Sequence, residues 1–259
     1  MLYGMCSGPE NIEKIKASGY DFIEGNLTKI CQWSEEELKE VKNRLVAADL
    51  PMLCSNCFFP GDIKVIDETE TPFDKTLEYI KKAFYRAAYL GIENPAFGSG
   101  NSRRIPQGVE PAEVHDRLIR VLGVMGDVAK EYGITMVIEP LSHEVAETIF
   151  TVSEALSYSR ELNHPNVKVL ADTYHMFIEK EPYTVFGECG DDLKNIHFSN
   201  PNPPKCRFFP HDVNEFDYKP IVDQIKAAGY NGKISIEARL EDPEVDIPSA
   251  VKVMKALFE

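Results

Sequence analysis

The sequence lacks an apolar run long enough to cross a membrane. No stretch reaches about 18 consecutive apolar residues, the length at which a transmembrane helix is suspected. The N-terminal segment Met1–Cys6 has no basic region ahead of an apolar core, as a signal peptide would. We therefore expect a cytoplasmic protein with no membrane partner.

Positive charge is also scarce. Lysine and arginine number 28 against 42 aspartate and glutamate residues, which gives a formal net charge of −14. Proteins that bind duplexes gain much of their affinity by neutralising phosphates with basic groups. No basic run of that kind is present, so we expect no nucleic-acid partner.

The six cysteines do not form a convincing disulfide framework. Cys54 and Cys57 have C-x-x-C spacing, but they lie on an expected strand rather than at a helix start, and no second such pair accompanies them. We expect reduced structural thiols; a site-lining, redox or zinc role is the alternative.

Signatures of nucleotide binding are absent as well. No Gly-x-Gly-x-x-Gly follows the first expected strand, and Gly-Lys-Ser/Thr does not occur. No internal repeat, low-complexity segment or interdomain linker stands out. The nucleotide-binding versions of a doubly wound open sheet therefore have no support.

What the sequence does contain is a regular alternation of short apolar runs and helical patterns. Mostly apolar runs are typical of parallel strands covered on both faces. The expected strands are Leu2–Ser7, Tyr20–Gly25, Met52–Phe59, Asn94–Phe97, Thr135–Leu141, Val167–Asp172, Leu193–Phe198 and Lys233–Ala238. The expected helices are Asn11–Ala17, Ser34–Ala48, Phe73–Leu90, Pro111–Tyr132, Thr151–Leu162, Asp217–Ala228 and Pro248–Phe258. Because eight strand–helix units in about 250 residues are typical of a (β/α)8 barrel, we predict one α/β TIM-barrel domain over residues 1–259. An open doubly wound sheet is the competing fold.

Four consecutive expected strands carry a potential metal ligand at or near their C-terminal ends. These residues are Glu139, Asp172, His197 and Glu237, on strands five to eight. In a TIM barrel these ends face one mouth, where active sites lie. A lone acid there is more often a helix cap or a solvated residue, but four in succession favour a shared site. Three carboxylates and an imidazole suit one divalent ion, Mn²⁺, Mg²⁺ or Co²⁺, with Zn²⁺ also compatible.

Further short motifs accompany these strand ends. They are Phe97-Gly98-Ser99-Gly100, Arg103-Arg104-Ile105-Pro106, Glu139-Pro140-Leu141, Glu147-Thr148, Asp172-Thr173-Tyr174-His175-Met176, Asn195-Ile196-His197 and Ile236-Glu237. With them the chain resembles the xylose-isomerase-like (β/α)8 superfamily. Within it, the chain is similar to the sugar (phosphate) isomerase/epimerase group, which includes ketose 3-epimerases and hydroxypyruvate-isomerase-like proteins.

This resemblance implies a role for each candidate residue. Glu139, Asp172, His197 and Glu237 would hold one divalent metal ion, with Mn²⁺ preferred. Glu139 and Glu237 would be the catalytic pair, one removing a proton from a small sugar substrate and the other supplying one to the opposite face, through a cis-enediolate. His175 would hold substrate oxygens.

The resemblance also extends to the loop after the seventh strand. Arg207, in the proline-rich loop 201–207, would contact substrate oxygens alongside His175. The chain departs from the pattern at Val145, where ketose 3-epimerases carry a further substrate-binding glutamate. The resemblance therefore implies an isomerase or epimerase of a small sugar or sugar derivative without naming the sugar.

Other functions stay open at this point. A metal-dependent lyase, such as an inosose-dehydratase-like or sugar-eliminating enzyme, would begin with the same proton abstraction. An abasic-site endonuclease shares the barrel but needs extra ligands on the earlier strands, which here end near Ser7, Glu24, Cys57 and Phe97. A non-catalytic binding protein is the last alternative, and self-association into a homo-oligomer is left open.

Overall fold

Eight parallel strands close into a barrel in the computed structural model, which describes residues 1–202 and 206–259. The strands are β1 (Leu2–Cys6), β2 (Phe22–Asn26), β3 (Met52–Asn56), β4 (Asn94–Phe97), β5 (Met136–Ile138), β6 (Val167–Asp172), β7 (Leu193–Phe198) and β8 (Lys233–Ile236). Each strand pairs with the next one in the chain, and β8 pairs with β1. The predicted (β/α)8 barrel is confirmed. Residues 203–205 of the proline-rich loop lie outside the described residues.

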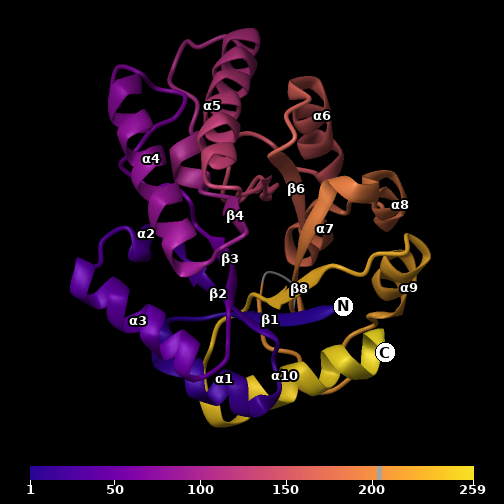
Figure 1. Ribbon diagram of the computed structural model, residues 1–259. Helices are drawn as coiled ribbons and strands as arrows, with labels where there is room; N and C mark the ends of the chain where they lie inside the picture. Colours follow the sequence, from indigo (N-terminus) through magenta and orange to yellow (C-terminus); the bar gives the residue numbers. More distant parts are fainter. Residues whose placement is uncertain (203–205) are drawn as a thin grey trace.

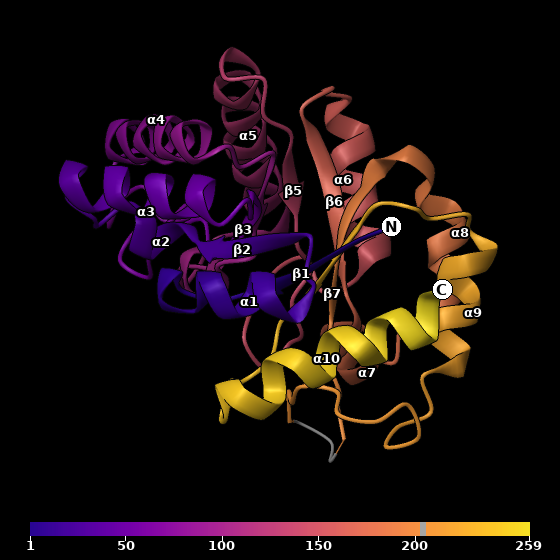
Figure 2. The ribbon, with the colours of Figure 1, turned by 60° about the horizontal axis from the view of Figure 1, so that its bottom comes forward.

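Helices surround the strands on all sides (Figure 1). They are α1 (Ile12–Ser18), α2 (Leu27–Ile30), α3 (Glu35–Ala47), α4 (Phe73–Leu90), α5 (Pro111–Glu131), α6 (Val152–Leu162), α7 (Thr173–Glu179), α8 (Phe186–Cys189), α9 (Lys219–Ala227) and α10 (Pro243–Phe258). Short 3-10 turns lie at Pro9–Asn11, Gly100–Arg103, Tyr183–Val185 and Gly190–Asp192. The last helix, α10, lies beside the first, α1, and so completes the ring (Figure 2).

The hydrophobic core has two parts because strand side chains alternate between the two faces of the sheet. Phe97 and Ile138 face outward and pack in a large cluster that includes helix residues such as Phe84. Ala96, Val137 and Leu170, from β4, β5 and β6, form a separate small cluster inside the barrel. This apolar cluster fills part of the barrel interior, beside buried polar residues such as Asn195.

Several element boundaries differ from the sequence predictions. Strand β5 covers only Met136–Ile138, so Glu139 lies just beyond the strand. The last helix begins at Pro243 rather than Pro248, because Asp242 caps it and Pro243 takes the first helical turn, the place that suits proline. Helix α2, after β2, and helices α7 and α8, between β6 and β7, were not predicted.

No helix in residues 1–202 and 206–259 combines the length and apolar content needed to cross a bilayer.

Candidate metal centre

The four strand-end ligands predicted from the sequence converge. Glu139, Asp172, His197 and Glu237 each offer a ligand atom, and these atoms all lie within 4.8 Å of one another. Asp172 and His197 are fully buried, Glu139 nearly so, and Glu237 is partly accessible. The cluster lies at the C-terminal end of the barrel, reached by four consecutive strands.

Backbone pairing places these residues. Asp172 and His197 are register partners on β6 and β7. Glu139 follows β5, and its N–H donates to the Phe97 carbonyl at 3.2 Å; Glu237 follows β8, and its N–H donates to the Phe198 carbonyl at 3.1 Å. The two glutamates are thus held by a neighbouring strand even though neither belongs to one.

The His197 ring lies at the centre of the cluster. Its Nδ1 is 2.7 Å from Glu237 Oε2, 3.0 Å from Glu139 Oε1 and 3.6 Å from Asp172 Oδ2. Burial would lower the pKa of His197, but the carboxylates of Glu237, Glu24 and Glu139 raise it well above its usual range. The site therefore attracts positive charge strongly.

The two glutamates have different electrostatic surroundings. Burial raises the pKa of Glu139 to about 7; the Glu237 and Asp172 charges add to this effect, and His197 opposes it. Burial also acts to raise the pKa of Glu237, but Arg207 and His197 outweigh it and lower that pKa to about 2. The pKa values of the two carboxyl groups are thus shifted in opposite directions.

The donor set fits a divalent metal ion. It offers three carboxylates and one imidazole nitrogen, all close enough to share one ligand sphere. Three carboxylates in such a small volume, two of them buried, also need positive charge to offset their repulsion. The chemistry of these groups allows several divalent ions and does not select one.

Arg207 reaches the same carboxylates. Its Nη2 contacts Asp172 Oδ2 and Glu237 Oε2, and its Nε donates to the Glu237 carbonyl at 2.8 Å. The guanidinium carbon also lies 5.3 Å from the centre of the Tyr174 ring. The predicted substrate-binding arginine therefore lies at the cluster of candidate ligands, where it supplies part of the countercharge.

His175 lies next to the cluster with a defined tautomer. The backbone N–H of Ser142 donates to His175 Nδ1 at 3.1 Å, so Nδ1 is an acceptor and the ring proton of the neutral form is on Nε2. Nε2 is 4.0 Å from Asp172 Oδ2. Burial lowers the pKa of His175. A neutral ring with its N–H directed toward the ligand cluster suits contact with a substrate oxygen, and that contact stays a prediction.

Two residues of the site have no role in the sequence prediction. Glu24, taken there only as the end of the second strand, lies within β2; it is 1% exposed and its Oε1 is 2.9 Å from His197 Nε2. Asn56 ends β3, and its Nδ2 donates to Glu237 Oε1 at 2.8 Å. A sequence signal for Glu24 was available, because it is an acid inside the apolar run Phe22-Ile23-Glu24-Gly25. No sequence pattern pointed to Asn56.

The loop after β4 leaves space for the Glu139 side chain. A Cβ atom on Gly98 would overlap Glu139 Oε2. Glycine is therefore the residue that lets this backbone approach the carboxylate so closely.

All six cysteines are free. Cys6 lies at the end of β1, and its Sγ lies within 4.8 Å of ligand atoms of Glu24 and His197.

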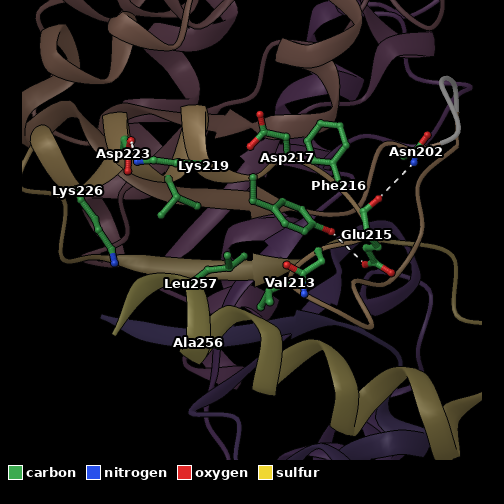
Figure 3. Close-up of a pocket in the computed structure, with 13 residues that line it drawn as sticks. Asn202, Val213, Glu215, Phe216, Asp217, Lys219, Asp223, Lys226, Ala256 and Leu257 are labelled. Atoms are coloured by element: carbon green, nitrogen blue, oxygen red, sulfur yellow. Dashed lines mark hydrogen bonds and ion pairs between the residues drawn. The ribbon is translucent and has the colours of Figure 1, made fainter.

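A surface groove of about 830 Å³ lies elsewhere, along α9 and the end of α10 (Figure 3). Its polar side chains pair with one another, Lys219 with Asp223 and the Tyr218 hydroxyl with Glu215. None of the six predicted site residues lines it. Because the buried ionisable groups gather at the strand ends instead, we place the functional site there and not in the groove.

Comparison with known proteins gives a consistent result. The 3-dehydro-D-guloside 4-epimerase of Escherichia coli (strain K12) is 28% identical over 248 residues, which cover 91% of this chain and 90% of that protein. The D-psicose 3-epimerase of Agrobacterium fabrum (strain C58 / ATCC 33970) is 24% identical over 213 residues, 78% of this chain and 72% of that protein. A crystal structure of D-psicose 3-epimerase in the presence of D-fructose superposes with a TM-score of 0.81 at 21% identity, covering 98% of this chain and 90% of that one. The family model for the xylose isomerase-like TIM barrel matches residues 12–257, and the chain therefore belongs to that family.

Proposed function

We propose that this chain is a metal-dependent epimerase or isomerase of a small sugar or sugar derivative. The observation that carries the proposal is the convergence of Glu139 and Glu237 with Asp172 and His197 at the strand ends of a barrel of this family. Epimerases among the relatives support the reaction class.

In this proposal Glu139, Asp172, His197 and Glu237 hold one divalent ion. When bound, that ion supplies positive charge that polarises the substrate carbonyl and stabilises a developing enediolate. Mn²⁺ is our preferred ion, with Mg²⁺, Co²⁺ and Zn²⁺ as alternatives for the same donor set.

The chain's own side chains carry the proton. One glutamate carboxylate accepts the proton of the carbon next to the substrate carbonyl; the C–H electrons form the enediolate double bond, and the carbonyl oxygen takes the negative charge. The other glutamate, as the acid, then delivers a proton to the opposite face, which inverts that carbon. Glu139 and Glu237 suit this division because they approach His197 Nδ1 from β5 and β8, two strands that are not neighbours.

His175 and Arg207 would hold substrate oxygens. The His175 ring donates from Nε2, since Nδ1 is engaged by Ser142. Arg207 offers the planar donor pattern that suits paired oxygens. His175 is buried and Arg207 is half-buried.

Among sugars we favour a keto-glycoside over a free ketose. The likeness to the 3-dehydro-D-guloside 4-epimerase spans nearly the full length of both chains, more than the likeness to the D-psicose 3-epimerase does. Val145 stands where the ketose 3-epimerases resembled by this chain carry a substrate-binding glutamate, and its side chain is exposed. A ketone at one ring carbon acidifies the proton on the next, which is the proton that this chemistry needs.

The test is turnover of 3-keto-glycosides and free ketoses with added Mn²⁺ in deuterated water. We expect deuterium at the inverted carbon. Glu139→Gln and Glu237→Gln should each lower turnover by about 100-fold or more, since positioned acids and bases contribute about 10²- to 10⁴-fold. Glu131→Gln, at an exposed residue at the end of α5, is the control and should not change turnover.

Two results would contradict the proposal. Undiminished turnover in either active-site variant would remove the acid–base roles. Release of water or of a leaving group during deuterium incorporation would instead identify a lyase on the same scaffold.

A further inference from the structure

Glu24 is a buried carboxylate that the proposed proton transfers do not use. It lies within β2, is 1% exposed, and is 173 residues away in sequence from the histidine that it contacts. Burying a carboxylate costs free energy unless it is paired and hydrogen-bonded, so its contacts show what it does.

Both oxygens of Glu24 have a partner. Oε1 is 2.9 Å from His197 Nε2, and Oε2 accepts from Asn195 Nδ2 at 3.0 Å. Asn195 and His197 lie two residues apart on β7 and so point to the same face of the strand, into the barrel. The Glu24 carboxylate therefore contacts β7 through two successive inward-facing side chains, Asn195 and His197.

This contact selects which nitrogen of His197 is free. An ionised carboxylate can only accept, so His197 Nε2 carries the proton that it donates to Glu24. The other nitrogen, Nδ1, faces Glu139, Asp172 and Glu237. A histidine that binds a metal through one nitrogen commonly donates from the other to a carboxylate, which orients the ring and increases its basicity.

We propose that Glu24 is a positioning residue for the metal centre: it holds His197 in the Nε2–H tautomer and aims Nδ1 at the three carboxylates. The inference rests on the proposed metal-binding function and adds a determinant of metal affinity that touches neither the metal nor the substrate. Asn195 supports it by holding the second carboxylate oxygen.

The structure offers a conservative variant. In Glu24→Gln the amide oxygen can still accept from His197, while the amide nitrogen faces Asn195. Because Asn195 Oδ1 has no hydrogen-bond partner among the described residues, a flip of that side-chain amide would present an acceptor to the new N–H. Glu24→Gln thus keeps the geometry and removes the charge, whereas Glu24→Ala removes both.

The experiment is Mn²⁺ titration by calorimetry on the full chain. Glu24→Ala should bind about 10- to 100-fold more weakly than wild type, the range typical of such outer contacts to metal ligands, and Glu24→Gln should lose less. The Mn²⁺ concentration for half-maximal turnover should rise in parallel, while turnover at saturating Mn²⁺ recovers much of the wild-type value.

A second readout separates positioning from general stability. Glu181 is also buried and accepts from the Val152 and Ser153 N–H groups at the start of α6. Glu181→Gln should lower the melting temperature without changing Mn²⁺ affinity. In ¹⁵N-histidine spectra of Zn²⁺-loaded protein, Glu24→Ala should lose the single Nε2–H form of His197, which Glu181→Gln keeps.

The other possible results of the Mn²⁺ titration separate failure of this inference from failure of the proposed function. Wild type that binds no Mn²⁺ overturns the proposed function together with this inference. Wild type that binds Mn²⁺ while Glu24→Ala binds it equally overturns the inference alone. Two bound ions, one of them lost in Cys6→Ser, would also overturn it, because Cys6, Glu24 and His197 would then be ligands of a second site.

Discussion

The absence of a side chain at Gly98 leaves room for the Glu139 carboxylate. Because a Cβ at residue 98 would overlap Glu139 Oε2, Gly98→Ala should displace that carboxylate while the surrounding barrel stays folded. We expect at least about a tenfold loss of Mn²⁺ affinity or turnover, since outer contacts to metal ligands carry effects of this size. Gly187→Ala is the matched control, because no atom in the part of the chain that the structure describes lies within 4 Å of its added Cβ. Equal Mn²⁺ affinity and turnover in both variants would show that Glu139 adapts freely.

At the residue scale the proposed metal ligands were predictable and their supports were not. Glu139, Asp172 and Glu237 end apolar runs, so the periodicity alone locates them. Glu24 and Asn56 act through contacts to residues 173 and 181 positions away, and no local pattern encodes such a contact.

Asp246 ties the start of α10 to its surroundings. Its Oδ2 accepts from the N–H groups of Glu241 and Asp242, both at 2.8 Å, and its Oδ1 is 2.7 Å from His211 Nε2. Burial opposes the lowered pKa of Asp246, and these N–H groups and His211 produce it. Asp246→Asn should therefore destabilise the protein by about 1–3 kcal/mol near neutral pH, as loss of hydrogen bonds to a charged group does.

The pH dependence of this effect has a definite sign. A carboxyl group whose folded pKa is lowered contributes stability above its unfolded pKa, about 3.9, and loses it as the pH falls through the folded value. Urea midpoints of wild type and Asp246→Asn should differ at pH 5 and approach each other progressively as the pH falls below about 4 toward the lowered pKa of Asp246. Asp191→Asn, at an exposed turn residue, should match wild type throughout. A difference that does not shrink between pH 5 and pH 3 would mean that the charge of Asp246 is not its source.

At the element scale, boundaries failed where a side chain rather than periodicity decides them. Helix α7 begins at Thr173 because Asp172 accepts from the N–H of Tyr174 and His175, a cap that belongs to the metal-ligand motif. The start of α10 moved because two prolines, Pro243 and Pro248, both suit a first turn and only the cap at Asp242 distinguishes them. The long helices α4 and α5 were predicted closely because apolar spacing and a following glycine define them.

At the scale of the whole molecule, metal binding should appear as thermal stability. A ligand that binds only the folded chain adds about 2.7 kcal/mol when its free concentration is 100 times its Kd. In chains of this size each kcal/mol shifts the melting temperature by about 2–4 °C. Chelation should thus lower the melting temperature of Mn²⁺-loaded protein by roughly 5–10 °C.

A ligand variant provides the control for that measurement. His197→Gln should show no response to chelator, because His197 Nδ1 is the centre of the proposed ligand set. If chelator has the same small effect on wild type and on this variant, metal binding does not stabilise the fold.

The barrel itself was predictable because eight apolar runs recur with helical patterns between them, and only a closed or open parallel sheet accommodates that order. Whether the parallel sheet closes into a barrel could not be predicted from the periodicity. It depends on the pairing of β8 with β1, whose partners, such as Tyr3 and Ile234, are more than two hundred residues apart.

The contact between Glu24 and His197 has a consequence for the order of folding. It joins β2 to β7, so it forms only when early and late segments of the chain have come together, and such distant contacts form slowly. A chain still being assembled would therefore lack a competent metal site. Added metal should then slow unfolding without speeding refolding. The time at which metal binds during refolding would therefore report when the barrel closes.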